Sequence, residues 1–387
     1  MSNIIRIDYL DKEIILVATA HVSKQSVIEV QEIIASEKPD TICVELDKER
    51  YDSIKNPKKW EDTDLIKIIK EQRTGLLLIN LILAAQQRKA AEHLDSKPGA
   101  EFLEAIKIAE ANNIKVVLAD RNVNTTFTRI YRSLSFMEKI KVLTSIIFST
   151  TQKEKTSEED IKEMIQEASL EGFVEEIKEE FPNLKKVLVD ERDQYLCAKI
   201  QNAPGKKIVA VLGAAHTIGI KELINTPQSI KGLDTLPPKK STATIIGFII
   251  PAIILLAIII SFTQSTSLGY TQIVSWILWN GSFAALGALL VLAHPITIIT
   301  AFIAAPITSL IPIIGVGFIT GIVEASLRKP TAKDAQNLPN DINTFTGFFK
   351  NRITKILIVV IVPSLFSAIA TFISGTNIIS NLFSFLN

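Results

Sequence analysis

The sequence predicts two parts of different character: an α/β domain with a mostly parallel sheet flanked by helices, and an all-α transmembrane bundle after it. Two observations carry this prediction. Through roughly the first 240 residues, short β-branched runs alternate with helical patterns, as in parallel sheets. From Ser241 to Val323 the 387-residue chain has no Asp, Glu, Lys or Arg, although the surface of a soluble domain must be solvated. We therefore expect an α/β domain at 1–225, a linker at 226–241 and a membrane domain at 242–387.

The elements of the α/β domain follow from apolar periodicity and turn residues. We expect a charged helical stretch at 158–180 to be a solvated helix pair, with a lid as the alternative. The apolar stretch 76–85 is too short to span a bilayer, which favours a buried core helix over a membrane-leaning one. The predicted strands are 13–18, 41–46, 115–119 and 206–213, and the predicted helices between them include 26–36 and 101–111.

Three segments of the membrane domain are long enough to span a bilayer, because a spanning helix needs about 20 apolar residues. They are 243–262, 270–293 and the slightly short 356–373. Residues 295–323 are also apolar, but several Pro and Gly residues interrupt them, which favours a broken or re-entrant pair of half-helices. His294 directly precedes this stretch, and its polar side chain is expected at a helix end near the interface.

Basic residues flank these apolar segments, and cytoplasmic ends of membrane helices are enriched in Lys and Arg. If all of them are cytoplasmic, an even number of crossings separates Lys240 from Arg328. Two full spans and a re-entrant hairpin meet that condition. The acidic residues Asp8 and Asp11 interrupt what would be the apolar core of a signal peptide. We therefore expect a multi-pass protein of the cell membrane with a cytoplasmic N-terminal domain, and its many small membrane residues favour a homodimer.

Composition also excludes some classes of protein. Basic and acidic residues are nearly balanced in the first part of the chain, so no nucleic-acid partner is expected. The two cysteines, Cys43 and Cys197, form no CxxC pair and cannot build a disulfide framework. They are predicted to be reduced and buried thiols.

Four predicted strands end in residues that carry chemistry. The strand at 13–18 runs into His21, the next into Glu45, the third into Asp120 and Arg121, and the last into His216. In open α/β sheets the ligand site lies beyond the carboxyl ends of the strands. The sequence therefore brings these side chains to one edge of the sheet.

The two histidine turns resemble each other, since ILVATAH and AVLGAAH both join an apolar strand to a small-residue turn. Two imidazoles and a carboxylate are a common open site for Zn²⁺ or a similar divalent ion such as manganese or cobalt, which lowers the pKa of bound water to about 7. Glu45 is the preferred third ligand or general base, and Arg121 is a candidate to stabilise an oxyanion. Glu101 and Glu191 are further catalytic candidates, whereas His93 lies in a polar helical pattern and is read as a surface residue.

With these motifs in place, the chain resembles the TraB family (TraB/PrgY/GumN, related to the Tiki proteins), in its archaeal type with a membrane C-terminal part. The resemblance covers nearly the whole chain. The motifs that carry it are ATAHVS, VELDKERY, PGAEFLEAI, LADRNVNTTFTR, VDERDQYL, VLGAAHTIGI, AHPITIITAFIAAPITSLIP and EASLRKPTAKD.

This resemblance implies a Tiki-like fold of the erythromycin-esterase/ChaN type. It also implies a metal site at the paired GxxH motifs and an acidic residue, with metal-dependent cleavage of peptides or signalling proteins near the membrane. The first motif departs from the family pattern, because Ala18 stands where the family often has Gly. Two alternatives remain: a non-catalytic membrane regulator that binds haem or another ligand through its histidines, and a membrane scaffold that recruits partners.

Overall fold

The structure is a computed structural model that divides by its contacts into two compact units. The first unit comprises Met1–Pro57 and Gln86–Lys239, and the second comprises Lys58–Ala85 and Lys240–Asn387. The first unit differs from the domain predicted at 1–225 in two respects: contacts assign Lys58–Ala85 to the second unit, and the first unit continues through most of the predicted linker to Lys239. The described residues are 4–19, 24–55, 65–71, 73–75, 77–78, 81–82, 85, 99–135, 138, 141, 179–238, 241–311, 314–342 and 344–386.

A mostly parallel sheet forms the centre of the first unit, as the sequence predicts, and its described part has five strands where four were predicted. The strand order is β1-β2-β5-β3-β4. β1 pairs antiparallel with β2, while β2 with β5, β5 with β3, and β3 with β4 are parallel. The bounds are β1 Ile4–Tyr9, β2 Lys12–Thr19, β3 Thr41–Val44, β4 Lys115–Leu118 and β5 Lys207–Gly213.

Helices cover both faces of this sheet, so alternate strand residues enter two separate cores. Ile15 and Val17 of β2 join one buried cluster with residues of α1 and α5, whereas Ile14 and Leu16 join another with α11 and α12. Burial on both faces explains why the parallel strands read as continuous apolar runs. The helices are α1 Lys24–Glu37, α2 Lys48–Lys55, α5 Ala100–Ala111, α6 Val123–Ser133, α10 Pro182–Lys185, α11 Glu191–Gln201 and α12 Ala214–Leu223, with a π-helical turn at Lys186–Asp190.

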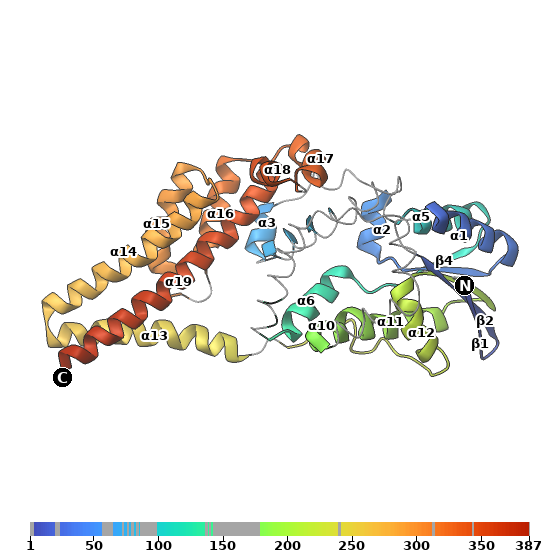
Figure 1. Cartoon of the computed structure of the whole chain (residues 1–387), viewed down its shortest axis with the longest axis horizontal. Coiled ribbons are helices and arrows are strands. Elements are labelled where there is room, and N and C mark those ends of the chain that lie inside the picture. The colour runs from blue at the N-terminus through green and yellow to red at the C-terminus, as the bar shows by residue number, and fades with distance from the viewer. Residues whose placement is uncertain are drawn as a thin grey trace. The chain divides into compact units, whose positions relative to one another are not determined.

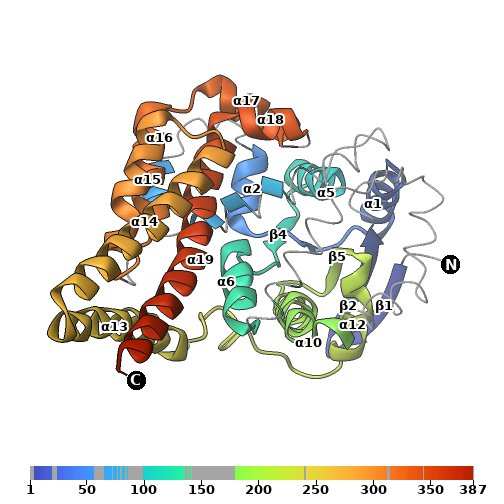
Figure 2. The same cartoon turned by 60° about the vertical axis from the view of Figure 1, so that its left-hand side comes forward.

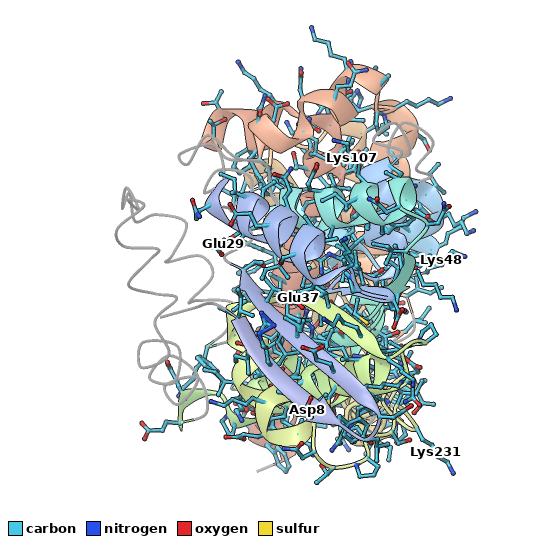
Figure 3. The ribbon with its side chains drawn as sticks, turned by 90° about the vertical axis from the view of Figure 1, so that its right-hand side faces the viewer. Asp8, Glu29, Glu37, Lys48, Lys107 and Lys231 are labelled. Atoms are coloured by element: carbon cyan, nitrogen blue, oxygen red, sulfur yellow. The ribbon has the colours of Figure 1, made fainter. Side chains whose placement is uncertain are left out.

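The outer surface of the first unit is polar. Asp8 on the edge strand β1 and Lys107 on α5 are exposed there, as Figure 3 shows. Charges on an edge strand discourage pairing with another sheet. Two predictions lie outside the described residues: the surface position of His93, and nearly all of the helical stretch predicted at 158–180.

Within the described residues, three helices of the second unit are long and apolar enough to cross a membrane. Their candidate spans are Gly247–Gln264, Thr266–Leu290 and Arg352–Ser384. The third is longer than the predicted 356–373, because α19 continues apolar to Leu386. α14 and α19 lie side by side (Figures 1 and 2). The helices of this unit are α3 Leu65–Lys70, α13 Ser241–Gln264, α14 Thr266–Leu290, α15 Pro295–Thr308, α16 Val316–Leu327, α17 Ala332–Asp341, α18 Phe345–Lys350 and α19 Arg352–Leu386.

α15 and α16 form the pair of short helices that the sequence predicts at 295–323. The chain enters and leaves this pair at the same end, because Glu324 of α16 contacts the start of α15. Its buried carboxylate accepts hydrogen bonds from the His294 backbone N–H at 2.9 Å and the Thr297 hydroxyl at 2.7 Å. Arg328 lies 3.0 Å from the other carboxylate oxygen. The single carboxylate within the apolar hairpin is thus paired, as buried charges require.

Glycines allow α16 to approach α19 closely. A Cβ atom on Gly317 would lie 1.7 Å from the carbonyl oxygen of Val360, whereas one on Gly315 would lie 3.7 Å from its nearest atom, the Ser364 hydroxyl. Small residues serve this purpose between membrane helices, where dispersion and polar contacts replace the hydrophobic effect.

Gly317→Ala is therefore expected to force the two helices apart and to cost about 1–3 kcal/mol of stability. Thermal unfolding of the full-length protein in detergent, followed by tryptophan fluorescence, measures this cost, because all three tryptophans fall within the second unit. The matched control is Gly315→Ala, which should unfold like the unaltered protein. Equal unfolding temperatures for both variants would contradict the close-contact role of Gly317.

Candidate functional site

The carboxyl ends of the parallel strands meet at one edge of the sheet, as the sequence predicts. Thr19 at the end of β2 is in register with Gly213 at the end of β5, so the two strands that precede the histidine motifs in the sequence end at matching positions. β3 is the other neighbour of β5, and Glu45 follows it directly. His21 lies outside the described residues.

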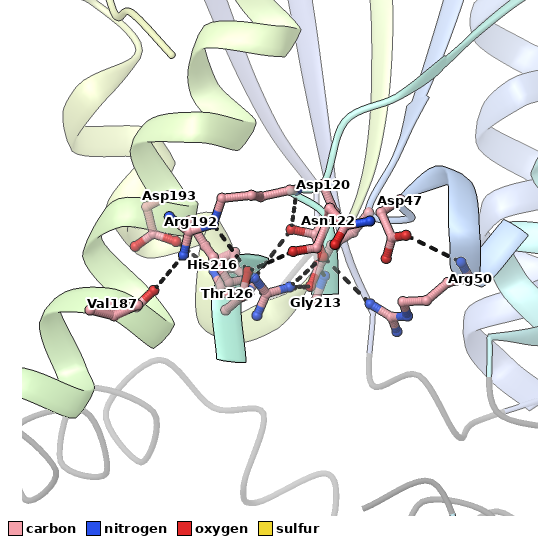
Figure 4. Close-up of polar contacts among 12 residues, drawn as sticks. Asp47, Arg50, Asp120, Asn122, Thr126, Val187, Arg192, Asp193, Gly213 and His216 are labelled. Carbon is pink, nitrogen blue, oxygen red and sulfur yellow. Dashed lines mark hydrogen bonds and ion pairs between the residues drawn. The ribbon is translucent and has the colours of Figure 1, made fainter. Parts of the chain in front are cut away.

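His216 lies in the first turn of α12, with Asp193 beside its imidazole (Figure 4) and Glu45 near the other ring nitrogen. Its Nδ1 atom is 2.5 Å from Oδ1 of Asp193, and its Nε2 atom is 3.4 Å from Oε1 of Glu45. All three residues are buried. An ionised carboxylate offers only acceptors, so the bond to Asp193 places a hydrogen on Nδ1 and directs Nε2 toward Glu45.

Gly219 makes room for Asp193 one turn beyond His216. A Cβ atom at Gly219 would lie 2.1 Å from Oδ2 of Asp193, a distance that van der Waals repulsion forbids. Burial raises the pKa of Asp193, and the hydrogen bond with His216 opposes that rise. The packing of α11 against α12 therefore sets how His216 is oriented.

Glu45 connects the ends of β3 and β5. Its Oε2 atom accepts a hydrogen bond from the Gly213 backbone N–H at 2.6 Å, and its Oε1 atom accepts one from Nη2 of Arg192 at 2.7 Å. Glu45 is 4% exposed. These charge-assisted bonds fix its position.

Arg192 bridges two strand ends. Besides Glu45, its Nη2 atom contacts Oδ2 of Asp120 at 2.8 Å, and its Nε atom contacts Oδ1 at 3.2 Å. Asp120 also accepts a bond from the Arg121 backbone N–H at 2.7 Å and lies 3.4 Å from Nη1 of Arg50. A guanidinium with its planar fork suits such bidentate contacts.

Asp47 lies at the same edge of the sheet, and its two carboxylate oxygens differ in their contacts. Its Oδ1 atom accepts the backbone N–H groups of Glu49 and Arg50 and so caps α2. Its Oδ2 atom is buried and has no partner among the described residues. Burial raises the pKa of Asp47 above its ordinary value.

The structure places Arg121 and Glu191 in a second network. The buried Arg121 guanidinium donates to Glu191 at 2.8 Å, to the Thr126 hydroxyl at 3.0 Å and to the backbone carbonyls of Val187 and Leu233. Every nitrogen of this guanidinium thus has a partner. Within the described part of the chain, its hydrogen bonds reach neither His216 nor Glu45. The role predicted for Arg121 at an oxyanion remains a prediction, whereas Arg192 contacts Glu45 directly.

Glu191 is shared by two arginines. Arg129 binds it through Nε and Nη2, each at 2.8 Å. Burial alone would raise the pKa of Glu191, but the bonds from Arg129 and Arg121 outweigh burial, and the pKa lies below 4.5. Glu101, the remaining candidate, is buried in the first turn of α5.

Sequence reasoning brings together His216 and Glu45 but misses Arg192 and Asp193. A signal for them was present. Three consecutive charges, Glu191 to Asp193, open a helix whose next residues are largely buried, and charges that enter a core need partners. A π-helical turn precedes these residues, and such turns are frequent at functional sites.

Comparison with known proteins identifies the family over both units. The TraB/PrgY/gumN family matches residues 3–229, and the C-terminal domain of TraB family proteins matches residues 242–383. An uncharacterized protein of Methanocaldococcus jannaschii is 33% identical over 374 residues, which cover 93% of each chain.

Two mammalian relatives match a smaller part. The TraB domain-containing proteins of Mus musculus and Homo sapiens are 29% and 28% identical over 255 residues, which is 58% of this chain and 65% of theirs. The family matches cover the sheet, the polar edge and the apolar helices described above. The chain therefore belongs to the TraB/PrgY/gumN family.

Proposed function

We propose that the polar edge of the sheet is the active site of a membrane-bound, metal-dependent hydrolase that cleaves peptides or signalling proteins near the membrane. The observation that carries this proposal is the line of buried side chains from Asp193 through His216 to Glu45. A carboxylate that holds one nitrogen of a histidine, while the other nitrogen faces a second carboxylate, is typical of metal sites.

The donor set suits a divalent ion such as zinc, manganese or cobalt. Nε2 of His216 and Oε1 of Glu45 are 3.4 Å apart, and two ligands at about 2.0–2.1 Å from a tetrahedral ion lie about 3.3–3.4 Å apart. Oε1 retains a lone pair beside its bond to Arg192. Among the described residues no three His, Cys, Asp or Glu side chains gather into a metal cluster, so the proposal requires a third ligand, and His21 is our candidate.

A bound ion of this kind supplies a water whose pKa is about 7. The protein contributes the proton transfers and the orientation. Asp193 keeps hydrogen on Nδ1 of His216, which leaves Nε2 as a donor of its lone pair. If Glu45 does not ligate the ion, its Oε1 atom is instead the group that could accept a proton from the attacking water, in the role of general base. Arg192 donates to the Oε1 atom of Glu45 at 2.7 Å and offers positive charge beside a developing oxyanion.

The membrane spans of the chain also support the proposed class of substrate. The second unit carries three candidate membrane spans, which favours a peptide or protein substrate presented at the cytoplasmic face of the bilayer. The homodimer suggested by the small residues of the spans belongs to the same proposal.

A specific observation favours one alternative function. Glu45 is already satisfied by Arg192 and Gly213 without any ion, and a fully paired network of this kind also suits a non-catalytic module that binds haem or another ligand through His216. Absorbance in the haem Soret band after reconstitution distinguishes the two.

Metal content tests the proposal directly. The full-length protein, purified in mild detergent without chelator, should hold near-stoichiometric metal, and His216→Ala should lose it. Cleavage of a fluorogenic peptide library should fall by about 10²–10⁴-fold in Glu45→Gln. His93→Ala is the matched control and should retain metal. A protein that binds no zinc, manganese or cobalt even after loading would overturn the proposal.

A further inference from the structure

A cavity of about 690 Å³ lies in the second unit, where the end of α14, the end of α16, α18 and the start of α19 come together. Four cationic side chains line it: Arg328, Lys350, Arg352 and Lys355. The remaining lining is mostly apolar and includes Leu290 and Leu327. The cavity therefore combines a basic part with an apolar part.

The positive charge of this cavity is only partly compensated. None of the described residues that line it is acidic. Glu324 pairs with Arg328 at 3.0 Å and is also occupied by the backbone of His294 and the Thr297 hydroxyl. Asp334 is 3.9 Å from Nε of Arg352.

The charges of the two lysines that line the cavity are compensated less than those of the two arginines. In the described part of the chain no carboxylate pairs with Lys350 or Lys355, and Nζ of Lys355 donates to the Leu292 carbonyl at 3.2 Å. Clustered cations without counter-charges repel each other. An anion inside the cavity would offset that repulsion.

The location of the cavity indicates the source of the anion. All six basic residues after position 240 lie between Arg328 and Lys355, from the end of the short apolar helix α16 to the first turn of the third candidate span. Leu290 and Leu327 on the same cavity are 57% and 43% exposed, as expected for side chains that face acyl chains. Basic pockets between membrane helices bind anionic lipid headgroups in this way.

We propose that this cavity binds the phosphate headgroup of an anionic phospholipid. Arg328 is pre-positioned for it, because Glu324 and the Leu292 carbonyl hold its guanidinium. Arg352 is fixed in turn by the Lys329 carbonyl at 2.9 Å. Lys350 and Lys355 then supply charge to the phosphate, while the acyl chains lie against the leucines.

Binding of short-chain lipids to the full-length protein in detergent tests this proposal. The probes are dioctanoyl phosphatidylglycerol, dioctanoyl phosphatidylcholine and inorganic phosphate, with native mass spectrometry or thermophoresis as the readout. The double variant Lys350→Gln/Lys355→Gln should bind the anionic lipid about 30-fold more weakly, because each basic residue at a membrane surface contributes roughly fivefold. Arg328 and Arg352 stay unaltered, so their structural bonds remain.

The matched control is Lys329→Gln/Lys333→Gln, which removes two charges from exposed positions outside the cavity. It should bind phosphatidylglycerol like the unaltered protein. Lys350→Gln alone, at an exposed position, should weaken binding about fivefold and guards against a folding defect in the double variant. Equal affinity for both lipids, equal loss in the control, or displacement of phosphatidylglycerol by inorganic phosphate at equal concentration would each overturn the lipid assignment.

Discussion

Asp193→Asn is expected to weaken metal binding and peptide cleavage by roughly 10–100-fold, because partners that orient a metal-ligating histidine contribute that much. The Asp193 carboxylate is 2.5 Å from Nδ1 of His216. An asparagine amide can donate to Nδ1 instead of accepting from it. The imidazole is then free to carry its hydrogen on Nε2, where the lone pair is needed.

The measurement is the zinc affinity of the full-length protein against a chelating dye, together with the cleavage rate. Asp190→Asn is the matched control, because Asp190 is close in sequence and forms an ion pair with Lys185 at the surface. It should keep both properties. If Asp193→Asn binds zinc like the unaltered protein, or if the control loses as much, Asp193 does not act by orienting His216.

Glu191→Ala should destabilise the first unit by about 3 kcal/mol, because removing one partner of a buried ion pair leaves charge uncompensated. Arg121 is 0% exposed and Arg129 is 11% exposed, and both bind this carboxylate. Both arginines keep their hydrogen bonds to backbone carbonyls in this variant. We therefore expect a loss of stability at the lower end of the range of about 3–5 kcal/mol known for breaking a buried ion pair. The unfolding temperature should fall by about 6–12 °C for a unit of this size.

Thiol exposure reports this change in the first unit alone. Cys43 and Cys197 are the only cysteines of the chain, both lie in the first unit, and both are fully buried. A thiol-reactive dye therefore fluoresces when that unit opens. Glu110→Ala is the control, because its exposed pair with Lys55 should contribute at most about 1 kcal/mol. A Glu191→Ala variant that unfolds normally but no longer cleaves peptide would instead support the catalytic role predicted for Glu191.

Lowering the pH should also show how much the ion pairs of Glu191 with Arg121 and Arg129 stabilise the first unit. The arginine hydrogen bonds hold the pKa of Glu191 in the folded protein below its ordinary value, so its ionised form stabilises the fold above the pH range in which an unfolded glutamate titrates. This contribution is lost as pH falls through the lowered pKa. Circular dichroism recorded between about pH 6 and pH 3, the range in which carboxylates titrate, should show a shallower acid response in Glu191→Gln.

Local sequence patterns predicted the strands because burial on both faces leaves continuous apolar runs, as in β5. The same patterns placed His216 and Glu45 at one edge, since strand ends are local features. β1 was not predicted. Its alternating residues, IIRIDY, form an antiparallel edge beside β2, and an edge strand carries a weaker apolar signal.

The contacts of Arg192 and Asp193 could not be predicted in this way, because they depend on the packing of α11 against the sheet edge. Sequence spacing alone does not show which of three neighbouring charges on a helix meets which strand end. The assignment of Lys58–Ala85 to the second unit is a similar case. It rests on contacts between residues that are far apart in the chain.

That assignment has a consequence for how the protein is made. Leu65 and Ile69 of α3 pack with Ala325 of α16 and with Ile356 and Leu357 of α19. The ribosome adds about 5–20 residues per second. The partners of α3 in α16 and α19 are therefore synthesised tens of seconds after α3 itself. During that time its apolar side chains lack their final contacts while the rest of the first unit is synthesised. Any fragment that ends at Lys239 keeps α3 permanently in that state, and such a fragment should aggregate unless Lys58–Ala85 is also removed.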